Sequence, residues 1–336
     1  MAKRGRPKKD KEITVEESKN ILKEANEIIK KEPKLSEEEI KRKDKLNEVL
    51  RGLSKKFGKN TVKFGSDVEE RERLPFINQN LTEFTGGGIP KGTYTTIWGS
   101  KGCAKTTIVL DLIAKAQELG ETCAYVNGER SYDPVWAKKM GVDIDKLIVI
   151  DVETIEEGLD AVIKLCREKV VDFIAFDSLH GLAPEGELYE GKAKKEKSVA
   201  QSTMALRARK LSQFFEMATP AVANSKCAVV LIGQSRMDLG SFIKIETLTG
   251  GHALLHNSRL ILKVRRGQGV DAPVKKEKVE KIVMNSEGDK VKKTTTISTK
   301  IGFDLVIKCN KAQISGIIEG QEIHLPFYYT EGLKDN

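Results

Sequence analysis

A glycine-rich segment that ends in lysine and threonine is the part of the chain best suited to chemistry. Residues 99–107 match the phosphate-binding pattern G-x-x-x-x-G-K-[ST] except at its second glycine, where Ala104 stands. In such a loop, backbone N–H groups surround the phosphates, the next helix adds its positive N-terminal end, and the lysine reaches the outer phosphates. The residues expected to bind the nucleotide are Gly99, Ser100, Lys101, Gly102, Cys103, Ala104, Lys105, Thr106 and Thr107.

Ala104 is the departure from this pattern. Alanine adds a single Cβ where glycine would let the phosphates approach most closely, so the change hinders that approach without abolishing it. We expect nucleotide binding to be kept and the rate of hydrolysis to be the property at risk. The plainer alternative is an ordinary strand-to-helix turn, but a strand-like stretch at 94–98 and an amphipathic stretch at 108–119 give the loop the context that a phosphate site requires.

Three polar side chains stand where other apolar stretches end. In a phosphate-binding fold, an aspartate at the position of Asp177 holds Mg²⁺ together with the hydroxyl of Thr106, although it can also simply cap the next helix. Glu129 has the chemistry of a general base that polarises the attacking water. Gln234 can hydrogen-bond the γ-phosphate and transmit its state to the segment that follows. We therefore assign catalysis to Glu129, Lys105 and Gln234.

Short apolar stretches alternate with amphipathic ones from about residue 73 onward. This alternation predicts an α/β fold with a mainly parallel central sheet and helices on both faces. Binding sites in such sheets lie at the carboxyl ends of the strands, where the candidate residues stand. The expected strands are 94–98, 122–127, 146–150, 172–176, 227–233, 294–299 and 303–309. The expected helices are 106–119, 134–140, 155–168 and 200–218, and residues 268–292 are expected to form an exposed excursion.

Composition limits the classes of protein that the chain can represent. With 336 residues, of which 39% are hydrophobic, it can bury one sizeable core and carry an appendage. It has no apolar run of about 18 residues and no apolar stretch after its basic N-terminus, which argues against a membrane span and a secretory signal. Its five cysteines are scattered without a C-x-x-C pair, so we expect no zinc or disulfide framework and a reducing, cytoplasmic location.

Positive charge is concentrated in three segments. Residues 1–60 hold 19 Lys and Arg against 12 Asp and Glu, residues 263–311 hold 13 against 6, and residues 192–210 hold 7 against 1. Clustered positive charge suits a polyanion such as DNA, although a lysine-rich face can also be simply solvated. Two glycine-containing loops, at about 184–200 and 237–250, are expected to hold DNA.

The order and spacing of these motifs resemble those of a RecA-family DNA recombinase, and one stretch, 207–220, is similar to the phage RecA or UvsX-like branch. The similarity runs from about Arg51 to Gln313. The segments that carry it are Lys56-Phe-Gly-Lys59, Gly86 to Gly92, the phosphate-binding loop, Asn127-Gly-Glu129, Tyr132 to Asp145, Phe176-Asp-Ser178, Gly233 to Met237, Thr249 to Leu254 and Lys263-Val-Arg-Arg266.

The resemblance implies ATP and Mg²⁺ as cofactors and assigns further residues to the nucleotide. Asp133 and Trp136 would flank the adenine. Lys311 would cap the ATP of the neighbouring subunit, so that ATP lies between protomers of a helical filament. Cys309 stands where the family has a second lysine, with Lys308 one step earlier.

We divide the chain into four parts on this basis. Residues 1–12 are a disordered basic arm with the Gly-Arg-Pro core of an AT-hook, for which non-specific phosphate binding is the simpler interpretation. Residues 13–72 form a helical region and a strand that packs on the next subunit. Residues 73–313 are the RecA-like ATPase core, and 314–336 are a short C-terminal extension in place of the family's full C-terminal domain.

The function that the resemblance implies is ATP-dependent homologous recombination. Such a protein forms a homo-oligomeric filament on single-stranded DNA, pairs it with homologous double-stranded DNA and exchanges strands, with DNA-stimulated ATP hydrolysis. A single-strand-binding or mediator protein would be a further partner, no membrane is involved, and the bacterial cytosol, including that of a phage-infected host, would be the location. Two alternatives stay open: a RecA-fold ring helicase or motor, and a nucleotide-gated DNA-binding protein with weak hydrolysis.

Overall fold

The computed structural model describes residues 36–58, 61–190, 195–196, 206–237, 246–248, 252–267, 272–284 and 290–333. The chain forms two compact units, Met1–Glu70 and Arg71–Asn336. The basic arm at 1–12, residues 13–35, about half of the expected DNA loop at 184–200 and most of the one at 237–250 lie outside the described residues. Among the helices that are described, none combines the length and the apolar character that crossing a membrane requires.

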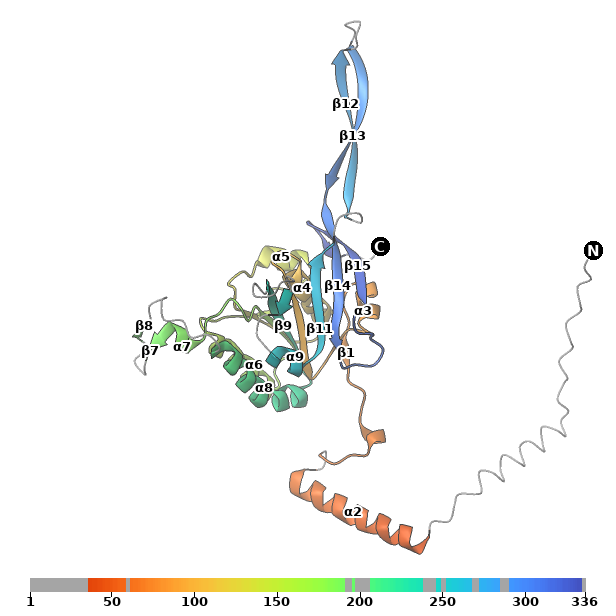
Figure 1. Ribbon diagram of the computed structural model, residues 1–336, viewed down its shortest axis with the longest axis vertical. Coiled ribbons are helices and arrows are strands. Elements are labelled where there is room, and N and C mark those ends of the chain that lie inside the picture. Colours follow the sequence, from red (N-terminus) through yellow and green to blue (C-terminus); the bar gives the residue numbers. More distant parts are fainter. Residues whose placement is uncertain are drawn as a thin grey trace, which may run out of the picture. The chain divides into compact units, whose positions relative to one another are not determined.

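A large sheet forms the centre of the second unit, with ten strands in the described part of the chain (Figure 1). Neighbouring strands in the series β11-β3-β9-β6-β4-β5 are parallel, and β14, β15 and β16 extend the sheet beyond β11 in antiparallel fashion. The parallel strands are β11 (Ser258–Arg266), β3 (Thr93–Gly99), β9 (Ala228–Met237), β6 (Phe173–Asp177), β4 (Cys123–Asn127) and β5 (Ile148–Asp151). The others are β14 (Gly302–Ala312), β15 (Glu322–Tyr328), β16 (Gly332–Leu333) and β10 (Glu246–Leu248), which pairs with β9. The expected mainly parallel sheet is confirmed.

Helices cover both faces of this sheet because its strands direct apolar side chains to both sides. In β4, Cys123 and Tyr125 join one hydrophobic cluster, whereas Ala124 and Val126 join the other. Strands buried on both faces consist of nearly continuous apolar residues, which is why the sequence pattern reveals them. The first cluster includes α4 (Lys105–Glu118), and the second includes α6 (Ile155–Glu168) and α8 (Leu206–Ser225). Short helices are α3 (Gln79–Phe84), α5 (Pro134–Lys139), α7 (Glu185–Leu188) and α9 (His252–Asn257).

One helix boundary differs clearly from the expected one. The helix expected to end at residue 218 is α8, which continues to Ser225 with Pro220 inside it. Proline removes a helical hydrogen bond, so the sequence favours an end near this position. Ala218 and Val222, on either side of the proline, are both buried in the second cluster. Their burial explains why tertiary packing extends the helix beyond its local preference.

The excursion expected at residues 268–292 is largely a β-hairpin. Strand β12 (Val274–Met284) pairs along its whole length with β13 (Lys290–Lys300) in antiparallel register, separately from the central sheet. The expected strand at 294–299 is therefore part of this hairpin. The hairpin does not pack against the hydrophobic core, so it has few apolar residues. The sequence therefore lacks the apolar periodicity of a strand over most of this segment and predicts a loop.

The described residues of the short C-terminal extension expected at 314–336 contribute two strands to the sheet. Strand β15 pairs with β14, and β16 pairs with β15. Leu325 and Phe327 alternate with more exposed residues and are buried in the first hydrophobic cluster, as is Leu333 of β16. This alternation is the pattern of a strand with one buried face. The packed core thus continues to Leu333, the last residue that the structure describes.

The first unit contains a helix and no strand in its described residues. Helix α2 (Glu37–Phe57) begins with a capping box, in which Ser36 accepts from the backbone of Glu39 and the Glu39 side chain accepts from Ser36. It is followed by the short 3-10 helix η1 (Gly65–Asp67). The strand expected in this region is assigned to packing on another subunit. Because such a strand completes its hydrogen bonds with the partner's backbone, a single chain does not provide them.

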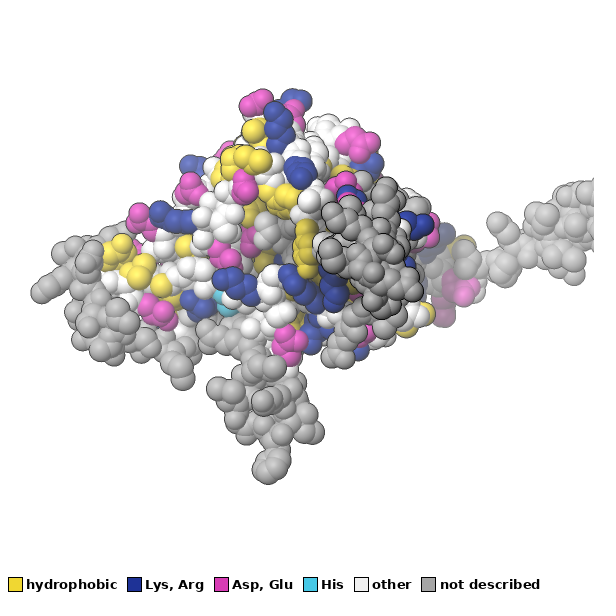
Figure 2. Space-filling view, turned by 90° about the horizontal axis from the view of Figure 1, so that it is seen from above, with side chains coloured by type: hydrophobic (Ala, Val, Ile, Leu, Met, Phe, Trp, Pro, Cys, Tyr) yellow, Lys and Arg dark blue, Asp and Glu magenta, His cyan; other side chains and the backbone are white. Residues whose placement is uncertain are grey.

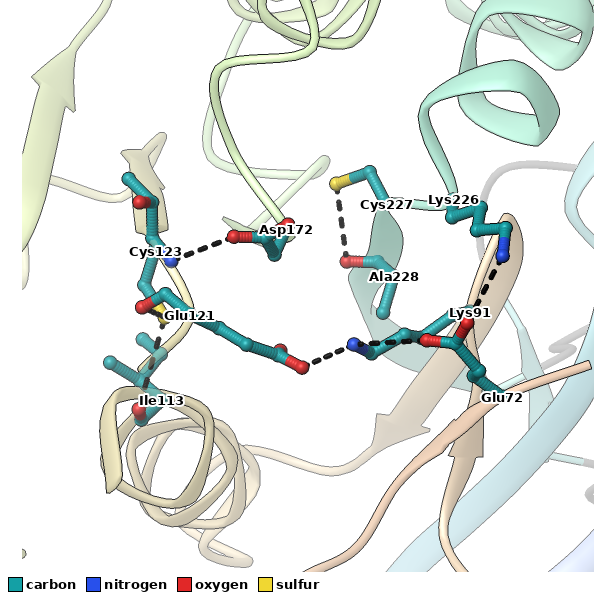
Figure 3. Close-up of polar contacts among 10 residues, drawn as sticks. Glu72, Lys91, Ile113, Glu121, Cys123, Asp172, Lys226, Cys227 and Ala228 are labelled. Atoms are coloured by element: carbon teal, nitrogen blue, oxygen red, sulfur yellow. Dashed lines mark hydrogen bonds and ion pairs between the residues drawn. The ribbon is translucent and has the colours of Figure 1, made fainter. Parts of the chain in front are cut away.

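A half-buried ion-pair network ties together the amino ends of the strands (Figure 3). Lys91, just before β3, contacts Glu121, just before β4, and lies 3.8 Å from Glu72. The side chains of Lys91 and Glu121 are only 14% and 13% exposed. Lys226 completes the network with a 3.1 Å bond to Glu72, but both of these side chains are more than half exposed.

We expect Lys91→Ala to lower the free energy of unfolding by about 2–3 kcal/mol, because it leaves the Glu121 carboxylate half-buried without its cation. Urea denaturation measures this loss. Lys226→Ala is the matched control and should cost less than about 1 kcal/mol, since its pair is exposed. Equal losses in the two variants would contradict the role given to burial. Nucleotide affinity should be unchanged in both, because the network lies at the opposite ends of the strands from the site described next.

Candidate nucleotide-binding site

The phosphate-binding loop connects the carboxyl end of β3 to the first residue of α4. A Cβ on Gly99 would lie 1.9 Å from the carbonyl oxygen of Val264 on β11, so only glycine fits at this strand end. The Lys105 side chain is 8% exposed and donates hydrogen bonds to the carbonyl oxygens of Gly99 at 3.1 Å and Ser100 at 2.7 Å. The loop therefore holds a lysine ammonium inside it, where nucleotide phosphates would be stronger acceptors than these carbonyls.

Ala104 adopts the left-handed conformation that glycine would supply at this position. Its φ is +69° and its ψ is +17°, immediately before α4. This conformation costs an L-residue such as alanine about 1–2 kcal/mol, and glycine would avoid that cost. Glycine, however, loses more conformational entropy on folding than alanine does, which offsets about 0.5–1 kcal/mol of the stability gained. We expect Ala104→Gly to raise the free energy of unfolding by about 0.5–1 kcal/mol in urea denaturation.

Gly102→Ala is the matched control for this prediction. Gly102 has a φ of +75°, and its Cβ position is 3.5 Å from the nearest atom, so an added methyl group meets ordinary contacts and the conformational cost dominates. The control should therefore lose stability where Ala104→Gly gains it. A loss of stability in Ala104→Gly would contradict the interpretation that alanine is strained in this loop.

Asp177 and Thr106 form a pair of oxygen ligands suited to Mg²⁺. The Thr106 hydroxyl donates to Asp177 Oδ2 at 2.6 Å, and Tyr125 OH donates to the same oxygen at 2.8 Å. Burial raises the pKa of the Asp177 carboxyl, and these two hydrogen bonds oppose that rise. A carboxylate and a hydroxyl beside a phosphate loop match the preference of Mg²⁺ for oxygen ligands. When bound here, Mg²⁺ would neutralise the charge that develops on the phosphoryl oxygens.

Glu129 and Gln234 are in direct contact. The Glu129 carboxylate accepts hydrogen bonds from the Gln234 side-chain amide and from the hydroxyl of Ser178, which is fully buried. The backbone N–H of Gln234 also donates to His180 Nδ1 at 3.2 Å. The carboxyl ends of β4, β6 and β9 thus bring together Glu129 and Gln234, two of the three residues that the sequence assigned to catalysis. Ser178 and His180 were not singled out as site residues, because their positions after β6 carry no separate pattern.

A pocket of about 300 Å³ lies against these residues. Its wall includes loop residues 101–107 together with Glu129, Asp177 and Gln234, whereas Gly99 and Ser100, also expected to bind the nucleotide, are not among its lining residues. Four further residues line it that the sequence analysis did not assign to the nucleotide: Arg266, Phe303, Phe327 and Tyr329. Three of them come from β14 and from β15 or the residue after it, so the antiparallel end of the sheet supplies an aromatic wall beside the phosphate loop.

Arg266 connects this aromatic wall to the loop. Its guanidinium donates two hydrogen bonds to the carbonyl oxygen of Gly102, at 2.9 and 2.7 Å. The same group lies over the Phe303 ring, 4.4 Å from the ring centre. The last residue of β11 is therefore fastened both to the phosphate loop and to the beginning of β14. Its Arg-Arg motif was visible in the sequence, but the pairing of β11 with β14 was not.

Asp133 and Trp136 lie near the loop but do not line the described pocket. The Asp133 carboxylate caps α5 by accepting from the backbone N–H groups of Val135 at 2.9 Å and Trp136 at 3.3 Å. The indole N–H of Trp136 donates to the Thr107 hydroxyl at 3.2 Å. The aromatic ring is thus held beside the start of α4, next to the phosphate loop.

Lys311 lies away from the pocket of its own chain. It pairs across β14 and β11 with Ile261, which in turn pairs with Thr96, three residues before the strand end at Gly99. Its ammonium donates to the carbonyl oxygens of Leu255 and His256. The structure therefore does not bring Lys311 together with this chain's phosphate loop, and a role toward a neighbouring subunit's nucleotide stays a prediction.

A β-bulge accounts for the unusual spacing of Lys308 and Lys311. Leu262 pairs with Cys309 and Ile261 pairs with Lys311, so Asn310 is an extra residue in β14. Because the bulge absorbs this residue, Lys308 and Lys311 lie on the same face of the strand, opposite the buried Cys309. Three-residue spacing in the sequence thus becomes the equivalent of two-residue spacing in the sheet.

The parallel sheet, the phosphate loop at its carboxyl edge and the adjoining carboxylates define a P-loop nucleotide-binding protein of the α/β class. The family described as RecA N-terminal domain matches residues 44–313. Protein RecA of Marinobacter nauticus is 36% identical over 255 residues, which cover 74% of this chain and 71% of that protein. Protein RecA of Teredinibacter turnerae is 35% identical over 257 residues, covering 74% and 73%. Protein RecA of Agrobacterium fabrum is 36% identical over 226 residues, covering 66% and 60%. The chain belongs to the RecA family of recombinases.

Proposed function

We propose that the protein is an ATP-dependent recombinase that forms filaments on single-stranded DNA and exchanges strands with a homologous duplex. The observation that carries this proposal is the contact between Glu129 and Gln234 at the edge of the phosphate pocket. It joins the candidate base for hydrolysis to the strand that leads into the expected DNA loop at 237–250. A recombinase needs such a link, because its hold on DNA must change with the nucleotide.

Each of these pocket residues has a different role in the proposed hydrolysis of ATP. Lys105 binds the outer phosphates, and Thr106 with Asp177 holds the metal. Glu129 accepts the proton of the attacking water, which makes that water a stronger nucleophile. Gln234 leaves the Glu129 carboxylate to hydrogen-bond the γ-phosphate. This exchange frees Glu129 for the water and draws on the end of β9, so nucleotide binding is transmitted toward the DNA loop.

A homo-oligomeric filament completes the proposed site. Asp133 and Trp136 flank the adenine, and Lys311 reaches the ATP of the neighbouring protomer, so each nucleotide lies between subunits. Helix α2 supports a packing role for residues 40–65, since it has no buried residue in the structure. Its side chains Leu46 and Val49 are 49% and 51% exposed, as expected for a surface that a second subunit covers.

Ala104 favours one second candidate, a nucleotide-gated DNA-binding protein that hydrolyses ATP only weakly. The methyl group of Ala104 lies where the phosphates would approach the loop most closely. The strained left-handed backbone of this residue would favour a change in loop conformation when the nucleotide binds. Under this alternative, the protein would assemble on DNA with ATP but turn it over slowly.

Electron microscopy of the full chain with single-stranded DNA and a slowly hydrolysed ATP analogue tests the proposal. We expect helical filaments that require both DNA and nucleotide. Closed rings would instead support a ring helicase or motor built on the same fold. Failure to assemble under any of these conditions would contradict both.

A further inference from the structure

The hairpin of β12 and β13 projects from the end of the sheet where the nucleotide pocket lies (Figure 1). It connects Arg266, at the end of β11, to Gly302, at the start of β14. Its base is fixed by backbone hydrogen bonds from Gly267 to Asp304 at 2.7 Å and from Ile301 to Pro273 at 3.0 Å. Arg266 and Phe303, which flank the hairpin in the chain, both line the pocket. The two ends of the hairpin are therefore connected directly to residues that line the pocket.

The described part of the hairpin has one distinctly basic face. The register pairs Lys276 with Ser298, Lys278 with Thr296, and Lys300 with Val274, and residues so paired lie on the same face. All three lysines are exposed, and within the described part of the chain none of them forms an ion pair. We call Lys276, Lys278 and Lys300 the basic face.

The opposite face of the hairpin is close to neutral over the same length. There Lys275 forms a 2.6 Å ion pair with Glu277, two residues further along the same strand. Their cross-strand partners are Thr299 and Ile297, which carry no charge. Over residues 274–278 and their partners 296–300, one face neutralises its lysine and the other carries three without an ion pair, so the charge is directional in this basal part of the ribbon. Further along the ribbon, the register places Glu280 on the same face as Lys278 and pairs Lys281 with Lys293 on the opposite face.

We propose that the basic face binds the phosphate backbone of duplex DNA. Lysines without carboxylate partners give up no ion pair on binding, and each phosphate that they neutralise releases counterions. The hydroxyls of Ser298 and Thr296 stand beside them as further phosphate donors. This site lies outside the two loops expected to hold DNA and goes beyond the proposed function.

The dimensions of the hairpin favour a duplex over a single strand. Each strand has 11 residues, and at about 3.4 Å per residue the ribbon is about 37 Å long, close to one turn of duplex DNA. A two-stranded ribbon also fits the major groove, which is about 12 Å wide. Residues 268–300 contain no Phe, Trp or Tyr, so they lack the stacking platforms on which single-stranded binding depends.

The surface at the base of the hairpin is compatible with a polyanion. Figure 2 views the molecule from above and shows Lys and Arg side chains gathered near the centre of this face. A duplex held by the hairpin would therefore lie at the end of the molecule that carries the nucleotide pocket. This placement would present a second DNA to a filament without occupying the expected DNA loops.

Binding of full-length protein to a fluorescent duplex of about one to three helical turns, without nucleotide and over a series of salt concentrations, tests the proposal. The test variant is Lys276→Gln/Lys278→Gln/Lys300→Gln. We expect the slope of log K against log salt to become shallower by about 2.7, which is about 0.9 for each of three phosphate contacts. Binding of single-stranded DNA, measured in parallel, should change much less.

Two controls decide how the result is interpreted. The triple Lys→Arg variant at the same positions keeps the charge and should bind the duplex as the unchanged protein does. Lys164→Gln/Arg167→Gln/Lys169→Asn removes three exposed positive charges from α6 and its C-cap, with Asn suited to the left-handed conformation of residue 169. An unchanged slope in the hairpin variant, an equal loss in the α6 variant, or an equal loss of single-strand binding would each overturn the proposal. Because no nucleotide is present, none of these outcomes depends on the recombinase activity.

Discussion

Glu129→Gln is expected to reduce the single-turnover rate of ATP hydrolysis by about 10²–10⁴-fold, the usual contribution of a positioned general base. The amide cannot accept the proton of the attacking water. It keeps the size of the carboxylate and its carbonyl oxygen can still accept a hydrogen bond from Ser178, so nucleotide affinity should stay within a few-fold of the unchanged protein. Rapid-quench measurement with excess protein over ATP reports the chemical step directly.

The matched control for this prediction is Glu121→Gln. It changes a second glutamate whose side chain is also hydrogen-bonded, at the opposite end of β4, where it pairs with Lys91. This variant should lose stability and keep its rate of hydrolysis when assayed well below its melting temperature. If Glu129→Gln and the unchanged protein hydrolyse ATP equally, Glu129 is not the base.

Lys105→Met is expected to weaken nucleotide binding by about 10–150-fold, corresponding to about 1.5–3 kcal/mol for hydrogen bonds to charged groups. Hydrolysis should fall further, by about 10²–10³-fold, because the ammonium also stabilises charge that develops during phosphoryl transfer. Methionine is unbranched and similar in length, so it fills the space of the lysine stem. Isothermal titration with ATP measures the affinity, and the phosphate-release rate measures hydrolysis.

Lys101→Met provides the control within the same loop. Lys101 also lines the pocket but is exposed, whereas Lys105 is 8% exposed and fixed by two carbonyl oxygens. An exposed lysine contributes less because water screens its charge. We expect the affinity lost in Lys101→Met to be several-fold smaller. Equal losses would mean that general positive charge, and not the position of Lys105, holds the phosphates.

The parallel core and the polar residues at its edge could be predicted from the sequence. Strands buried on both faces are continuous apolar runs, and in parallel strands the residues that follow such runs meet at one edge. Asp177 and Gln234 are placed correctly by this rule alone, although they stand 57 residues apart in the chain. The proximity of Glu129 and Gln234 follows from the same geometry. The hydrogen bonds that Ser178 and His180 make with these two residues could not be predicted in this way.

The antiparallel part of the site could not be predicted in the same way. Phe303 and Phe327 look like ordinary core residues in the sequence, because each stands in a short stretch that contains other apolar residues. Their position beside the phosphate loop depends on the order of strands in the sheet, in which β14 and β15 follow β11. Strand order is a long-range property that local periodicity does not encode.

The hairpin and the bulge escaped prediction for a related reason. β12 and β13 are held together mainly by backbone hydrogen bonds. Because every residue type except proline can form these bonds, they do not produce a recognisable pattern of side chains in the sequence. The bulge at Asn310 changes which residues share a face by shifting register, which is a matter of pairing between two strands. The structure thereby places Lys308 and Lys311 on the same face, an arrangement that their spacing in the sequence conceals.

The rate of ATP hydrolysis by the full chain with and without single-stranded DNA tests the central claim most directly. The proposed link between Glu129 and Gln234 predicts that single-stranded DNA stimulates hydrolysis, and that Gln234→Ala hydrolyses ATP at a rate that DNA no longer changes. Equal rates with and without DNA in the unchanged protein would contradict the claim that the nucleotide pocket and the DNA-binding segments work together.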